Sequence, residues 1–211
     1  MDDTDARGAL LSALTTEHFV LQTANSSTYA EASARSSLYV MALSSSLVAM
    51  GFVSGSPDVL VPFAATVLPA VFVLGLFTTV RLVETVLESI HYLAGIAHIR
   101  QHYRTLGRDA ERLFAPHYGR WPEVESPAQR LGPVLSFFGT TASMIAVINN
   151  GVAGAAVAVL LHALWPALPT IAHVGVGIAL AVALTVAFYR YQRWRFSEYD
   201  VRTRGENARA G

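Results

Sequence analysis

The sequence predicts an all-α, polytopic membrane protein with four transmembrane helices in two hairpins, the first two helices extending into a cytoplasmic helical stalk. Three windows, residues 36–57, 59–80 and 131–189, contain no Asp, Glu, Lys or Arg. A helix needs about 20 mainly apolar residues to cross a hydrocarbon core of about 30 Å. The first two windows therefore fit one span each, and the third fits two. Apolar runs of this length are typical of membrane proteins and not of soluble domains.

The arginines predict the orientation of these spans. All 15 basic residues are arginine: two precede the first window, seven lie between the second and third windows, and six follow the third. The short connections at 54–58 and 165–170 contain none. Cytoplasmic loops of membrane proteins are enriched in Lys and Arg. We therefore expect a multi-pass protein of the cell inner (cytoplasmic) membrane with both termini cytoplasmic.

The first transmembrane hairpin, with its cytoplasmic extensions, is expected to occupy residues 1–105. No proline interrupts the sequence before Pro57, so one long helix should lead from about Asp5 into the first span. The turn at 54–58 offers Ser56 as N-cap and Pro57 as the first helical position of the next helix. We expect Pro69 to kink this second helix, which continues to about Arg104.

The remaining chain divides into a cytoplasmic loop at 106–132, a second transmembrane hairpin at 133–190 and a basic tail at 191–211. The loop is rich in Gly and Pro and includes a short helix near its start, at 108–114. The segment 133–164 would be about 48 Å long as one helix. Either its first turns lie in the interface, or it breaks at Asn149-Asn150-Gly151. Aromatic and Arg residues interleave after the last span and predict an interfacial anchor.

Ionisable residues form one stripe on the second helix beyond its span. They recur at alternating spacings of three and four, which places them on one helix face: Arg81, Glu84, Glu88, His91, Gly95, His98 and His102. Glu88 and His91 have the spacing found in di-metal carboxylate bundles, so Glu84, Glu88 and His91 are candidate metal ligands, a second copy supplying the rest. The alternative is salt bridging between the stalk helices, with histidines that titrate near neutral pH.

Four residues at the base of the stalk are expected to form ion pairs. Counted outward from the membrane edge of each helix, Arg35 lies level with Glu84, and Glu31 lies near Arg81. Exposed pairs of this kind contribute about 0–1 kcal/mol. We therefore expect them to set the register of the two helices more than their stability.

Small residues recur every four positions in the last two spans. Such residues allow helix backbones to approach closely in a membrane. We expect the two spans to pack through two ladders, Ala142, Ala146, Asn150, Gly154, Ala158 and His162 on one helix, and Gly175, Ala179, Ala183 and Ala187 on the other. The alternative is that a face of small residues contacts a second subunit.

Polar residues inside the apolar windows have two interpretations. Asn149 and Asn150 either join helices through hydrogen bonds or line a polar path. His162 and His173 flank the outer turn, and with Asp58 they are either interfacial residues or ligands of an external metal.

Composition and motifs exclude several functions. The chain has no cysteine, which removes thiolate metal sites and cysteine nucleophiles. No phosphate-binding glycine loop, nucleophile elbow, dinucleotide fingerprint or zinc-protease motif is present. We therefore expect no cofactor and no catalytic residue. A formal net charge of zero, with the basic residues beside a span, indicates contact with the lipid bilayer and not with nucleic acid.

Three segments carry a resemblance. TTEHFVLQ at 15–22, the EASARSSLYV that leads into the first span, and IRQHYR at 99–104 are similar to a group of uncharacterised four-helix integral membrane proteins of high-GC Gram-positive bacteria. The resemblance covers the first half of the chain. It implies the same four-helix fold and no known activity.

The function expected from these patterns is a non-enzymatic membrane protein. It would bind a protein partner, or a second copy of itself, through its cytoplasmic helices. One alternative is an oligomeric channel or pore-forming effector that uses Asn149, Asn150 and the serines of the first span, Ser44, Ser45 and Ser46. A second is a metal-dependent membrane enzyme built on Glu84, Glu88 and His91.

Overall fold

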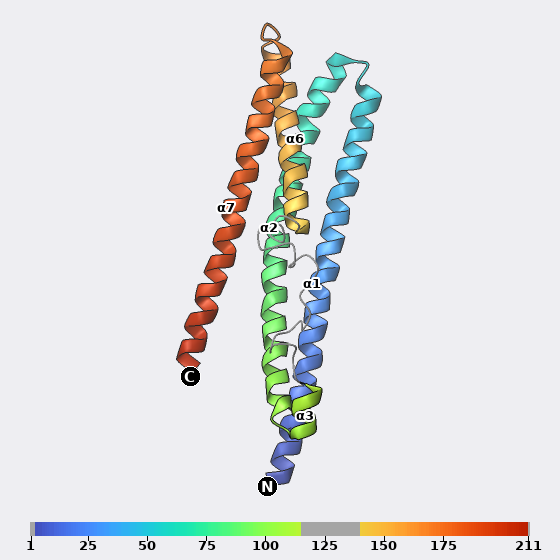
Figure 1. Ribbon diagram of the computed structural model, residues 1–211. Coiled ribbons are helices and arrows are strands. Elements are labelled where there is room, and N and C mark those ends of the chain that lie inside the picture. Colours follow the sequence, from blue (N-terminus) through green and yellow to red (C-terminus); the bar gives the residue numbers. More distant parts are fainter. Residues whose placement is uncertain (1–2, 115–139, 211) are drawn as a thin grey trace. The chain divides into compact units, whose positions relative to one another are not determined.

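The computed structural model describes residues 3–114 and 140–210, with side chains for 5–114 and 140–199 (Figure 1). In these residues all regular secondary structure is α-helical, as the sequence predicts, and the helices are α1 (Asp3–Val53), α2 (Pro57–Arg104), α3 (Arg108–Leu113), α6 (Thr141–Leu164) and α7 (Thr170–Ala210). Four of them, all except α3, are long and apolar enough to cross a membrane. Most of the expected loop, and the start of the third apolar segment, lie outside the described residues.

The helices belong to two compact units. In its described part, unit 1 contains residues 3–32 of α1, 84–104 of α2, and α3. Unit 2 contains the rest of α1 and α2, together with α6 and α7. Unit 1 thus has nearly the same residues that the sequence assigns to the stalk, and unit 2 holds the apolar windows.

α1 is a single helix of 51 residues although it is rich in Ser and Thr. Its hydroxyls bond back to carbonyls of the preceding turn: Thr15 Oγ1 donates to the Leu11 carbonyl at 2.8 Å, and Thr23 Oγ1 to the Phe19 carbonyl at 2.9 Å. This pattern satisfies a hydroxyl without breaking the helix. The polar composition of α1 is therefore compatible with its length.

The α1–α2 connection has the expected turn chemistry. Ser54 Oγ donates to the Gly51 carbonyl at 2.7 Å at the end of α1. α2 begins at Pro57, and the backbone N–H of Leu60 reaches the Ser56 carbonyl at 2.9 Å. The predicted helix start is confirmed. α2 then passes both internal prolines and ends at Arg104, also as expected; a kink at Pro69 stays a prediction.

α6 begins at Thr141, and the Thr140 side chain caps it by accepting a hydrogen bond from the Ser143 backbone N–H at 3.2 Å. The helix then runs unbroken through residues 149–151. The expected alternative of a break at Asn149-Asn150-Gly151 is therefore wrong. Its 24 residues span about 36 Å, which suits a bilayer core without interruption.

α7 has 41 residues and continues past the apolar window. The segment 191–210, which the sequence sets apart as a tail, is a direct extension of the last span. No proline lies in α7, and Gly205 is its first glycine after Gly177. The backbone of α7 is therefore one continuous helix from the apolar window through residue 210.

Candidate functional site

The polar centre of unit 2 is the side chain of Asn149, which is 2% exposed. Tyr39 of α1 is fully buried, and its hydroxyl donates to Asn149 Oδ1 at 3.2 Å. Asn149 Nδ2 donates to the Phe72 carbonyl of α2 at 3.1 Å. A β-carbon at Gly75, one turn further along α2, would collide with Asn149 and Tyr39, so only glycine leaves room for this arrangement. One amide thus joins three helices.

Asn150 points to the fourth long helix. Its Nδ2 donates to Thr185 Oγ1 of α7 at 3.1 Å, and this hydroxyl donates in turn to the Ala181 carbonyl at 2.8 Å. Adjacent residues on a helix lie about 100° apart, so neighbouring asparagines reach different partners. Together they bond α6 to the three other long helices. Of the two interpretations of these asparagines, the contacts favour the one in which they join helices, rather than the one in which they line a polar path.

α6 and α7 pack along each other through backbone contact. A β-carbon at Gly154 would collide with the Gly177 carbonyl, and one at Gly177 would meet the Gly154 carbonyl in the same way. The first four members of the ladder predicted for α6, Ala142, Ala146, Asn150 and Gly154, are buried, whereas Ala158 is half-buried and His162 is exposed.

The ladder predicted for α7 is wrong. Gly175, Ala179, Ala183 and Ala187 are all exposed, and a β-carbon at Gly175 would meet nothing within 4 Å. The face that meets α6 instead contains Gly177 and Thr185. These positions are offset by two residues, or about 200° around the helix, so the predicted ladder lies on nearly the opposite side.

The two histidines at the α6–α7 turn contact each other. His173 is 2% exposed, and its Nε2 lies 3.2 Å from the Trp165 carbonyl oxygen. The ring centroids of His162 and His173 are 5.3 Å apart in a T-shaped arrangement. The described residues contain no group of three metal-binding side chains, so the external metal site with Asp58 is not supported.

Unit 1 is held together by contacts between α1 and α2. Ser89 Oγ donates to Asn25 Oδ1 at 2.7 Å. Nearer the end of α2, a β-carbon at Gly95 would lie 3.0 Å from Leu21 Cδ1, so these helices also approach closely. The sequence places Gly95 on the ionisable stripe, and its role is to make room for Leu21.

A groove of about 520 Å³ lies along the same contact. Its lining has no Asp, Glu, Lys or Arg and combines amides and hydroxyls with apolar side chains: Phe19, Gln22, Thr23, Asn25, Ser26, Leu93 and Ile96. Phe19 is 63% exposed at this groove. An exposed aromatic ring beside uncharged polar side chains is typical of a contact surface.

His18 of α1 lies beside the C-terminal end of α2 in unit 1. Its ring lies 6.3 Å from that of Tyr103, which in turn packs 5.4 Å from Phe114 beyond α3. The guanidinium of Arg100 lies 5.9 Å from the centre of the Phe114 ring. Burial of the imidazole, and then the positive charge of Arg100, lower the pKa of His18 below its ordinary value. His18 Nδ1 is buried, with no hydrogen-bond partner among the described residues.

On the ionisable stripe of α2, His91, His98 and His102 are exposed, whereas Arg81, Glu84, Glu88 and Gly95 are half-buried. The candidate metal ligands Glu84, Glu88 and His91 belong to no group of three metal-binding side chains in the described residues. A site shared with a second copy stays a hypothesis.

The predicted ion pairs, Arg35 with Glu84 and Glu31 with Arg81, would each join unit 1 to unit 2. They also stay predictions. Each of the four residues lies inside a continuous helix, which is the geometry that the pairing requires.

Sequence reasoning missed several of the residues that hold the units together. Tyr39, Gly75 and Thr185 carry the polar contacts of unit 2, and Asn25 with Ser89 carries that of unit 1. The four-residue spacing of Gly177, Ala181 and Thr185 was a readable signal. The other positions had none, because their partners are distant in the sequence.

Comparison with known protein families, curated proteins and solved structures finds no match to this chain.

Proposed function

We propose that this chain is a multi-pass protein of the cell inner membrane that associates with a second copy of itself through the groove of unit 1. In this proposal the long helices form two hairpins, both termini are cytoplasmic, and unit 1 is the cytoplasmic stalk. The single observation that carries it is the uncharged groove with Phe19 exposed beside it.

The occupant is inferred from charge. The groove has no charged side chain that would anchor an ionic ligand. The α1 segment 19–30 also contains no Asp, Glu, Lys or Arg, and it presents exposed Phe19, Val20 and Tyr29. This segment therefore has the chemistry that the groove would accept. Two copies confined to one membrane also meet at a high effective concentration.

Cysteine crosslinking tests the association directly, because the natural chain has no cysteine. We expect Phe19→Cys to give a disulfide-linked dimer when native membranes are oxidised. His98→Cys is the matched control, since it is exposed on α2 but does not line the groove. Equal dimer yields from both variants, or none from Phe19→Cys, would reject the proposal. A crosslinked product whose mass is not twice that of the chain would indicate a different protein partner.

The proposed topology has its own test. A membrane-impermeant maleimide applied to whole cells should label Ser56→Cys, in the α1–α2 turn. It should label Thr105→Cys, beyond the end of α2, only after the cells are opened. The arginine distribution supports this orientation; the reverse labelling would overturn it.

Neither alternative function gains support. Both asparagines of the third apolar window have hydrogen-bond partners within unit 2, which supports a role in joining helices. The enzyme alternative depends on a metal shared between copies, and purified protein without stoichiometric metal would remove it. The resemblance to four-helix membrane proteins of high-GC Gram-positive bacteria stays a prediction.

A further inference from the structure

The continuity of α7 fixes the depth of its first arginines. The 20 residues from Thr170 to Tyr189 rise by about 30 Å, which equals the thickness of the hydrocarbon core. The helix continues without interruption. Residues 190–197 therefore occupy the next 12 Å or so, at the level of the lipid headgroups. This step rests on the proposal that α7 crosses a membrane.

One face of α7 is open at that depth. Arg190, Arg193, Trp194 and Ser197 are exposed, and their spacing of three and four places them on a common face. Gln192 lies on the other side, where it is 1% exposed and its Oε1 accepts from Ser143 Oγ of α6 at 3.4 Å. The inward and outward sides of the helix are thus distinct.

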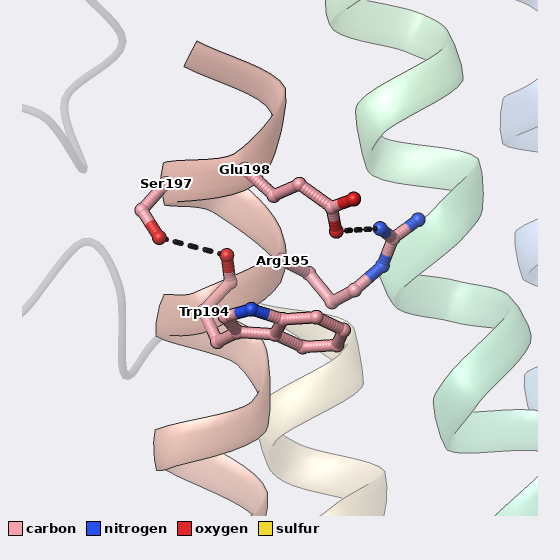
Figure 2. A network of polar contacts seen from close by, with 4 residues as sticks. All are labelled: Trp194, Arg195, Ser197 and Glu198. Atoms are coloured by element: carbon pink, nitrogen blue, oxygen red, sulfur yellow. Dashed lines mark hydrogen bonds and ion pairs between the residues drawn. The ribbon is translucent and has the colours of Figure 1, made fainter. Parts of the chain in front are cut away.

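The arginines of this segment are not equivalent. Arg195 is ion-paired to Glu198 at 2.6 Å (Figure 2), and its guanidinium lies 5.8 Å from the centre of the Trp194 ring. Arg190 and Arg193 form no ion pair with any side chain that the structure describes. One positive charge is therefore compensated within the helix, and two are available to an anion.

We propose that Arg190 and Arg193, flanked by Trp194, bind the phosphate groups of anionic phospholipids on the side of the membrane that carries the C-terminus. Guanidinium groups donate two parallel hydrogen bonds to phosphate oxygens. An indole ring places its apolar body in the acyl region and its N–H at the headgroups. The opposite charges of the arginine pair and the lipid select anionic over zwitterionic headgroups.

Fluorescence quenching by brominated lipid tests the preference. Trp121→Phe and Trp165→Phe leave Trp194 as the one tryptophan of the three. The full chain is reconstituted into phosphatidylcholine vesicles that contain phosphatidylglycerol, with bromine on one lipid at a time. We expect brominated phosphatidylglycerol to quench Trp194 several-fold more than its mole fraction predicts.

The variants separate Arg190 and Arg193, which would bind lipid, from Arg195, which is ion-paired to Glu198. The double variant Arg190→Gln/Arg193→Gln should reduce the quenching by brominated phosphatidylglycerol to the level expected from its mole fraction. The double variant Arg190→Lys/Arg193→Lys should restore most of the quenching above that level. Arg195→Gln is the matched control: it removes one charge from the same segment and should leave the excess unchanged. Helical content by circular dichroism confirms that each variant is folded.

Three results would overturn the proposal. Quenching in proportion to mole fraction in the parent protein would show no anionic preference. An equal loss in Arg195→Gln would show that general charge, and not this pair, attracts the lipid. Absence of quenching by either lipid would show that Trp194 lies away from the bilayer. Each result is independent of the crosslinking at residue 19, so this proposal and the proposed self-association fail separately.

Discussion

Unit 1 and unit 2 bring the same two helices, α1 and α2, into contact by different means. In unit 2 a buried amide connects them, and glycine is required wherever backbones or the amide approach closely. In unit 1 the two helices are connected by the hydrogen bond between Ser89 and Asn25, and the flexible side chain of Leu21 packs against Gly95. An open groove lies beside this contact.

The difference follows from the surroundings that each unit is proposed to have. In hydrocarbon every buried polar group needs a partner, and packing has no hydrophobic drive, so close backbone contact has to supply the attraction. In water apolar burial drives association, and unfilled polar groups remain hydrated. Unit 2 should therefore be intolerant of added atoms, whereas unit 1 should be tolerant.

The largest effect is expected from Gly154→Ala in unit 2. The new β-carbon would collide with the Gly177 carbonyl, and backbone cannot rotate away as a side chain can. We expect the free energy of unfolding to fall by about 3 kcal/mol. Unfolding by SDS titration in mixed micelles, followed by circular dichroism, measures it. Gly151→Ala is the control, since its β-carbon would meet nothing within 4 Å. Similar losses in both variants would contradict the proposed contact.

The next effect is expected from Asn149→Leu, which removes two hydrogen bonds and leaves the Tyr39 hydroxyl buried without its acceptor. We expect a loss of about 1–2 kcal/mol in the same unfolding assay. Asn150→Leu should cost less, because the Thr185 hydroxyl keeps its bond to the Ala181 carbonyl. A double-mutant cycle with Tyr39→Phe should show positive coupling to Asn149 and none to Asn150.

A smaller effect is expected from pH in unit 1. The pKa of His18 is lowered by burial and by Arg100, so below the ordinary pKa of 6.5 the unfolded chain binds more protons than the folded one. Unit 1 should lose stability as the pH falls from 6.5 through the folded pKa, and should be unaffected at higher pH. Hydrogen exchange of residues 10–30, corrected for intrinsic rates, measures this change.

His18→Asn should remove most of that pH dependence. His91→Gln should leave it intact, because His91 is exposed on α2. If His91→Gln abolished the dependence and His18→Asn did not, the sensitive group would lie on the α2 stripe, as the sequence alone suggested.

The smallest effect is expected from Gly95→Ala, the counterpart of Gly154→Ala in unit 1. The new β-carbon would lie 3.0 Å from Leu21 Cδ1, the end of a side chain that can change rotamer. Alanine also favours the helix by about 1 kcal/mol relative to glycine. We expect unchanged or slightly increased stability. A loss as large as that of Gly154→Ala would remove the contrast between the two units.

The parts of this protein that could be predicted from sequence are those that depend on local composition. Charge-free windows predicted the four long helices, and Pro57 predicted the start of α2. The first four positions of the α6 ladder, from Ala142 to Gly154, are buried as the spacing predicted, because residues four apart lie on one face of a helix. The α7 ladder failed because that helix has small residues on two faces, and periodicity cannot say which one meets a neighbour.

The sequence by itself determined the helical class, the start and end of α2 and the asymmetric distribution of arginine, because each depends on residues close together in the chain. Only the tertiary structure decided that Asn149 bonds to Tyr39 and Phe72, and that Gly154 meets Gly177. The physical reason is that an amide or a glycine has the same local chemistry in many places. Its role depends on which atoms of other helices lie within a few ångströms.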